Sequence, residues 1–181
     1  MKIVAPVTFG DVLADWGRHE GQGNALQHYR PEQIGSLDGP GGRERAIAFI
    51  RRFRAPLIAP LEAACIIGCY LVEMTPGDFG MLRGWGGQSL EQHAETALTA
   101  PGGQGPWVRY LADAPNEITG PLLVVGRGTS GPFVVLDGLH RAAAWVVHVQ
   151  GGREYSMSAN VVITARPLLK LGVEVPKGGT T

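Results

Sequence analysis

The chain has 181 residues, of which 44% are hydrophobic, and its 27 Gly and 13 Pro predict many turns within a globular domain. Its 16 basic and 16 acidic side chains cancel, so a nucleic-acid interface would need a local basic patch. No apolar run is long enough to span a bilayer, and the segment Met1–Val7 is too short for a signal peptide. These features predict a cytoplasmic protein with no membrane partner.

Residues 1–62 are expected to form an N-terminal extension, with a short helix at 11–18 and a loop at 21–42. Apolar residues then recur with helical spacing from Arg43 to Leu57, and Pro56 is expected to end the regular helix near residue 54 or 55. The other face of this helix carries five arginines, which are Arg43, Arg45, Arg51, Arg52 and Arg54. Such a face could bind a phosphate backbone or an anionic membrane surface, but it is more often simply exposed to solvent.

The two cysteines, Cys65 and Cys69, lie in one apolar stretch at 63–72. Their spacing would let two thiols face one another on a helix, but separate buried core thiols are the more common case. A structural disulfide is therefore not expected, in agreement with a reducing cytoplasm.

The middle of the chain alternates short elements with turns. Residues 70–75 are the most strand-like part, and 78–82 suit a short helical turn capped by Asp78 or Thr75. Ser89 and Gln92 have the spacing of a capping box, which predicts a helix over 89–98, and 106–112 suit another helical turn.

From Pro121 onward the hydrophobic pattern is clear. It predicts strands at 122–126, 133–136 and 158–164 and a helix at 140–149, followed by a C-terminal tail at 167–181. Strand and helix periodicities thus occur in one chain, which predicts an α+β fold.

The most informative residues are Asp137-Gly138-Leu139-His140-Arg141, where a buried strand turns abruptly into an Ala-rich helix. Unpaired N–H groups at a helix start attract anions, and Arg141 adds a planar guanidinium whose N–H donors suit phosphate. His140 adds a proton donor or acceptor, Gly138 permits close approach of the backbone, and Asp137 would cap the helix, hold Arg141 or bind Mg²⁺. The alternative is an N-cap followed by a surface His and Arg.

The order of elements over residues 121–163 resembles the ParB/sulfiredoxin-like superfamily. In that family a Gly-x-[His/Arg]-Arg-x-x-Ala signature at a strand-to-helix corner binds nucleotide phosphates, and Gly138, His140, Arg141 and Ala144 match it. The resemblance implies a small mixed sheet flanked by helices, over a core at 63–166.

The chain also departs from this family. Sulfiredoxins place a catalytic cysteine before His-Arg, where this chain has Leu139, so sulfinic-acid reduction is not expected. Chromosome-partitioning members continue into a helix-turn-helix DNA reader, which is not expected in the few residues after 164. The resemblance then implies a stand-alone nucleotide-binding domain, related to a free-serine kinase that uses ADP and to nucleases.

Phosphoryl transfer also needs a base or a metal-binding carboxylate. Beside His140, the candidates are Asp78, near the place where kinase-like relatives carry an acidic residue, and Glu73. Asp78 could instead cap a helix, and Glu73 could be the solvent face of a strand.

The expected function is that of an enzyme that binds ATP, ADP or CTP with Mg²⁺ and transfers a phosphoryl group to a small hydroxylated acceptor. A nuclease or toxin-type hydrolase acting on phosphodiesters is the first alternative, although the neutral charge does not favour nucleic acid. A non-catalytic module gated by nucleotide is the second. Neither the acceptor nor the oligomeric state follows from the residues.

Overall fold

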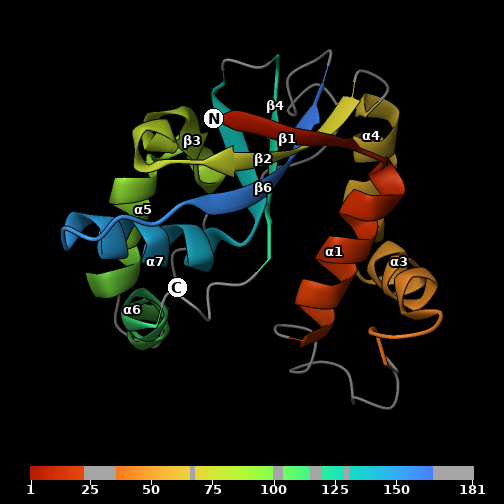
Figure 1. Cartoon of the computed structure of the whole chain (residues 1–181), viewed down its shortest axis with the longest axis horizontal. Coiled ribbons are helices and arrows are strands. Elements are labelled where there is room, and N and C mark those ends of the chain that lie inside the picture. The colour runs from red at the N-terminus through yellow and green to blue at the C-terminus, as the bar shows by residue number, and fades with distance from the viewer. Residues whose placement is uncertain (23–35, 66–67, 100–103, 115–119, 129–130, 165–181) are drawn as a thin grey trace.

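The computed structural model describes residues 1–22, 36–65, 68–99, 104–114, 120–128 and 131–164. They form an α+β fold around a mixed six-stranded sheet with the strand order β1-β2-β6-β4-β5-β3 (Figure 1). The strands are β1 (Lys2–Val7), β2 (Gly68–Met74), β3 (Leu82–Arg83), β4 (Leu122–Gly126), β5 (Phe133–Asp137) and β6 (Met157–Ile163). The predicted C-terminal tail at 167–181 lies outside the described residues.

Neighbouring strands pair in both directions. The pairs β1·β2, β2·β6 and β4·β5 are antiparallel, whereas β4·β6 and β3·β5 are parallel. Because β4 and β5 are antiparallel, with Leu123 opposite Asp137, the end of β5 lies beside the start of β4. This edge of the sheet carries the corner singled out in the sequence.

Helices cover both faces of the sheet (Figure 1). On one side lie α1 (Phe9–Gln22), α3 (Gly42–Phe53) and α4 (Ala55–Ala64), and on the other lie α5 (Leu90–Thr99), α6 (Gln104–Asp113) and α7 (Leu139–Gln150). Two short 3₁₀ helices, η2 (Pro76–Met81) and η3 (Trp85–Gly87), flank β3. Since both faces are covered, all five residues of β4 are buried, as expected of a central strand.

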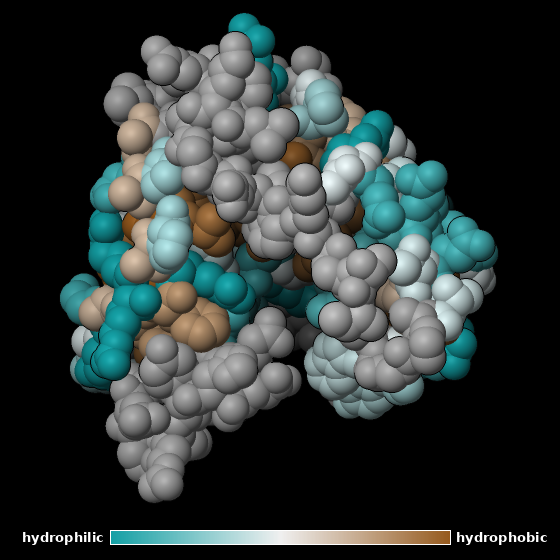
Figure 2. Space-filling view, turned by 180° about the vertical axis from the view of Figure 1, so that it is seen from behind, coloured by the Kyte–Doolittle hydropathy of each residue, from teal (hydrophilic) through white to brown (hydrophobic). Residues whose placement is uncertain are grey.

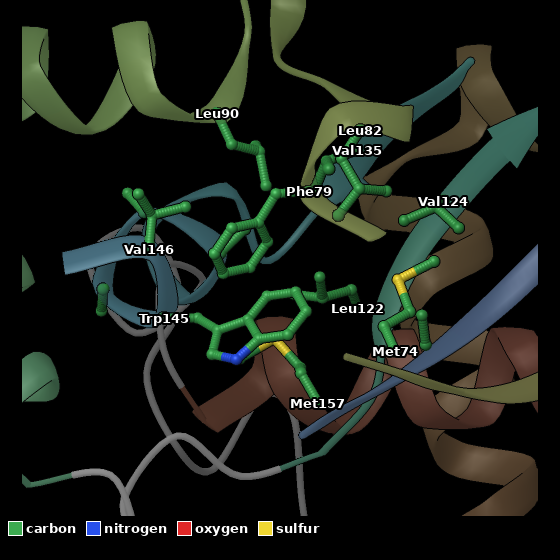
Figure 3. Close-up of a cluster of buried hydrophobic side chains, with 14 of the residues drawn as sticks. Met74, Phe79, Leu82, Leu90, Leu122, Val124, Val135, Trp145, Val146 and Met157 are labelled. Atoms are coloured by element: carbon green, nitrogen blue, oxygen red, sulfur yellow. The ribbon is translucent and has the colours of Figure 1, made fainter. Parts of the chain in front are cut away.

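The larger hydrophobic core lies between the sheet and α5, α6 and α7. Trp145 is fully buried there and meets Phe79 edge-on, with ring centroids 4.3 Å apart (Figure 3). The indole Nε1 of Trp145 donates to the Tyr155 carbonyl at 2.7 Å, so this large ring leaves no polar group unpaired. The core therefore anchors α7 firmly behind the β5–α7 corner.

A second core joins the opposite face of the sheet to α1, α3 and α4. Its buried members include Leu13, Ile50 and Leu61 from the three helices. Seen from behind, hydrophobic atoms are mostly in the half that carries these helices, whereas the half with α5, α6 and α7 is mainly hydrophilic (Figure 2).

Several predicted elements are confirmed. The predicted strand-loop-strand-helix-strand order after Pro121 matches β4, β5, α7 and β6. Ser89 and Gln92 exchange hydrogen bonds of 3.1 and 3.2 Å as a capping box before α5, and Thr75 and Asp78 form another at η2. The regular helix of the basic segment ends at Phe53, as Pro56 predicts.

The N-terminal segment is more regular than predicted. Residues 2–7 form β1, an edge strand on β2, and the predicted short helix at 11–18 extends over Phe9–Gln22. The segment expected as an extension thus supplies a strand and helices to the same architecture. Arg54 is the single residue between two helices, because a further helix, α4, begins at Ala55.

The expectation of two separate core thiols was wrong: Cys65, at the end of α4, forms a disulfide with Cys69 in β2. Cys65 follows the end of α4 and Cys69 belongs to β2, so the two sulfur atoms do not lie on one helix face. Within the described residues, no helix is both long and apolar enough to cross a membrane.

Candidate functional site

The β5–α7 corner depends on a glycine. Gly138 has φ +83°, in the left-handed region that suits glycine, and it stands between the end of β5 and the first residue of α7. A Cβ there would lie 2.6 Å from Leu122 Cδ2 and 2.7 Å from Arg141 Nη2. Among the described residues no side chain caps this helix start, so the corner has the geometry expected of an anion site.

Arg141 ties the corner together. Its Nη2 donates to Asp137 Oδ2 at 2.9 Å, and its Nη1 donates to the Gly120 and Pro121 carbonyls at 3.2 and 3.4 Å. Both charged side chains are only 14% exposed. The observed role of Asp137 is therefore to hold Arg141. An anion could contact the Arg141 guanidinium only beside Asp137 and the two carbonyls, or by replacing them.

Burial shifts the pKa of the corner carboxylate. Loss of solvation raises the pKa of Asp137 above its ordinary value, while the charge of Arg141 and an N–H from Gly138 oppose the shift. With its charge balanced by Arg141, Asp137 is a poor ligand for Mg²⁺. Among the described residues, no group of three or more His, Cys, Asp or Glu could hold a metal ion.

The structure brings a second histidine to the corner. His93, on α5, lies with its ring centroid 6.5 Å from that of His140, on the first turn of α7. Burial lowers the pKa of both imidazoles, and His140 lowers that of His93 further, so both are mainly neutral near pH 7. The Nε2 atom of His93 is buried without a hydrogen-bond partner among the described residues.

A buried ion pair lies on the other side of the corner. Glu20, in the last turn of α1, is 3% exposed and accepts hydrogen bonds from Arg54 Nε at 2.8 Å and Nη2 at 2.5 Å, both on Oε1. Its charge acts on Asp137 and on Arg141, and that of Arg54 acts on Asp137. Four alternating charges therefore meet where the N-terminal helices approach the end of β5.

The two predicted catalytic carboxylates have structural partners of their own. Asp78 accepts a hydrogen bond from the Met1 amino group at 2.5 Å and from Thr75, and these bonds lower its pKa although burial opposes them. Glu73 is 44% exposed and lies 3.7 Å from Lys2 Nζ on the neighbouring strand. None of these contacts connects either carboxylate to His140, and both have the structural roles that were the alternatives.

The basic face of the N-terminal segment is largely engaged within the protein. Arg43 pairs with Asp11, Arg51 with Glu62 and Arg54 with Glu20, while Arg45 donates to two backbone carbonyls. These contacts reduce the charge available to a phosphate backbone.

Comparisons with protein-family models, with curated proteins and with solved structures found no match to this chain.

Sequence reasoning missed His93 and Glu20. His93 has no neighbouring residues with ligand spacing, and Glu20 lies in a helix whose predicted length stopped short of it. A signal was present for Glu20: it is an acidic residue near the end of its helix, where the helix dipole disfavours it, so a tertiary partner was needed.

Proposed function

We propose that the protein binds the phosphate groups of a nucleotide at the β5–α7 corner. The observation that carries the proposal is the start of α7 at left-handed Gly138, which no described side chain caps, beside the imidazoles of His140 and His93. A neutral imidazole donates one N–H, so His140 adds a side-chain donor to the backbone N–H groups of the helix start.

The proposed reaction is phosphoryl transfer from ATP or ADP to a small hydroxylated acceptor. Such catalysis consists mainly of positioning and charge stabilisation, together with a base for the acceptor hydroxyl. A lowered pKa leaves His93 or His140 ready to accept that proton near neutral pH. Mg²⁺ would enter with the nucleotide, because phosphate oxygens and waters commonly supply most of its ligands.

Calorimetric titration with ATP, ADP and CTP in the presence of Mg²⁺ tests the binding step. His140→Ala removes the side-chain donor, and Gln150→Ala, at the exposed opposite end of α7, is the matched control. We expect micromolar binding of at least one nucleotide by the wild type and the control, with a large loss in His140→Ala. Absence of binding to all three nucleotides, or equal binding by His140→Ala, would contradict the proposal.

Turnover tests the reaction separately. Wild-type protein that binds ATP or ADP should consume it only when a hydroxylated acceptor such as serine or glycerol is added. His93→Ala and His140→Ala should each reduce that turnover. Consumption at the same rate without acceptor would contradict transfer to a hydroxylated acceptor.

Phosphodiester hydrolysis is a second candidate, favoured specifically by the pair of imidazoles. Two neighbouring histidines can serve as base and acid around one phosphate without a metal ion. Incubation with RNA homopolymers and bis(p-nitrophenyl) phosphate in EDTA tests this possibility. Cleavage that disappears in both His93→Ala and His140→Ala would support it, and absence of cleavage would rule out this metal-independent mechanism.

A further inference from the structure

A disulfide joins the N-terminal helices to the sheet. Cys65 is the C-cap residue of α4, and Cys69 is the second residue of β2, which lies between β1 and β6. These are the only two cysteines of the sequence, and neither is among the residues of the β5–α7 corner. The bond is therefore a reactive group that the proposed function leaves unused.

The two halves of the disulfide differ in exposure. Cys65 is only partly buried, whereas Cys69 is 4% exposed and packs in the second core with Leu61 and Val162. Thiol–disulfide exchange requires a thiolate to reach one sulfur atom of the bond, so its rate depends on access. A thiol in solution therefore reaches the Sγ atom of Cys65 more readily than the Sγ atom of Cys69.

Cleavage of the bond should leave the fold in place. The two cysteines are four positions apart, so the disulfide closes a short loop and restricts the unfolded chain less than a long-range bond would. Pairing with β6 holds every residue of β2, and Ile58 and Leu61 anchor α4 in the second core. The oxidised and the reduced protein can thus share one architecture and differ in how firmly the end of α4 is attached.

We propose that Cys65 and Cys69 form a redox-active pair, which changes between a disulfide and two thiols by exchange with a low-molecular-weight thiol. Reduction of the pair frees the end of α4 from β2. The proposal is independent of nucleotide binding, because it rests on the disulfide and on the different exposure of its two halves.

Reduction takes place in two steps. A thiolate attacks the Sγ atom of Cys65, the bond between the two cysteines breaks, and the sulfur of Cys69 leaves and takes up a proton. A second thiolate then attacks the mixed disulfide on Cys65, which releases the Cys65 sulfur, protonated to a thiol, and a small-molecule disulfide. Two electrons pass to the protein as two small thiols are oxidised. Oxidation by the small-molecule disulfide follows the same steps in reverse, and Cys69 displaces the small thiol from Cys65.

Equilibration of the folded protein with glutathione and glutathione disulfide at a series of ratios tests the exchange. Acid quenching, alkylation in denaturant and intact-mass measurement then count the thiols. We expect a reversible change from no alkylated cysteine to two, while tryptophan fluorescence shows that the protein stays folded. Two thiols at every ratio, or a disulfide that persists in the most reducing buffer, would overturn the proposal.

Two single variants test the order of attack. Cys69→Ser leaves the accessible cysteine without its partner, so glutathione disulfide should leave one glutathione on Cys65. Cys65→Ser is the matched control and should gain glutathione far more slowly, because Cys69 is buried. Equal rates of glutathione addition to the two variants would contradict attack at Cys65.

Hydrogen exchange of the wild type in the oxidised and reduced states tests the release of α4. Peptides from the last turn of α4 should exchange faster after reduction, because the helix end loses its covalent attachment to β2. Peptides from α5, on the other face of the sheet, provide the internal control and should exchange at one rate in both states. Equal exchange of α4 in the two states would overturn the proposed release.

Discussion

Replacing Gly138 by alanine should destabilise the protein far more than the same change at Gly152, which lies just past the other end of α7. The two glycines have nearly the same left-handed backbone, with φ +83° and +80°. A Cβ at Gly152 would meet no atom within 4 Å, whereas one at Gly138 would lie 2.6 Å from Leu122 Cδ2 and 2.7 Å from Arg141 Nη2. Comparing Gly138→Ala with Gly152→Ala therefore separates the cost of backbone strain from the cost of the collision at the corner.

The magnitudes follow from these surroundings. A left-handed conformation costs an L-residue about 1–2 kcal/mol, and this is the whole effect expected for Gly152→Ala. Leu122 is fully buried in a close-packed core and cannot move aside without strain. Displacing Arg141 instead weakens its ion pair with Asp137, and breaking a buried pair costs about 3–5 kcal/mol. Because the ion pair is weakened rather than broken, only part of that cost adds to the backbone strain of about 1–2 kcal/mol, and Gly138→Ala should lose about 3–5 kcal/mol in total.

Urea unfolding followed by tryptophan fluorescence measures both variants, because the chain contains four tryptophans. Unchanged slopes would show that the difference in midpoint reflects stability of the folded state. Free energies of unfolding within about 1 kcal/mol of each other would refute the close packing of the corner around Gly138.

Two further predictions concern charged groups. Arg54→Ala should lower the free energy of unfolding by about 1–3 kcal/mol, because it removes the counter-charge of Glu20, whose side chain is only 2% exposed. Arg51→Ala should cost less than about 1 kcal/mol, because its partner Glu62 is 50% exposed, and equal losses in urea unfolding would contradict this difference. The lowered pKa values of His93 and His140 mean that the unfolded chain binds more protons below about pH 6.5, so their contribution to stability is lost as the pH falls below that value. The variant His93→Gln should therefore lose less stability than wild type between pH 7 and pH 5, and a steeper loss would contradict the assignment of a buried neutral imidazole.

The C-terminal half could be predicted because its signals are local. Apolar runs predict β4 and β5, and an Ala-rich run predicts α7. Because α7 directly follows β5 in the sequence, the corner between β5 and α7 follows from this order. By contrast, β1 is a short edge strand containing Pro6, and its exposed Ile3 and Val4 break the expected alternation. Only its pairing with β2 identifies this segment as a strand, and that pairing joins residues far apart in the sequence.

The candidate site divides in the same way. Asp137, Gly138 and Arg141 are neighbours in sequence, so their convergence could be inferred from the strand-to-helix turn. His93 reaches His140 only because α5 packs on α7. Sequence spacing therefore predicted which residues form the corner but not which residues surround it, and it could not show that Asp78 and Glu73 pair with Met1 and Lys2.

The N-terminal helices contribute to the charge balance of the corner. Glu20, on α1, interacts electrostatically with Asp137 and with Arg141, and Arg54, which precedes α4, acts on Asp137. The backbone of the corner, by contrast, depends on Gly138 and on the packing of α7 against the larger core. A phosphate group bound at the start of α7 would therefore meet a network of charges that helices on both faces of the sheet supply.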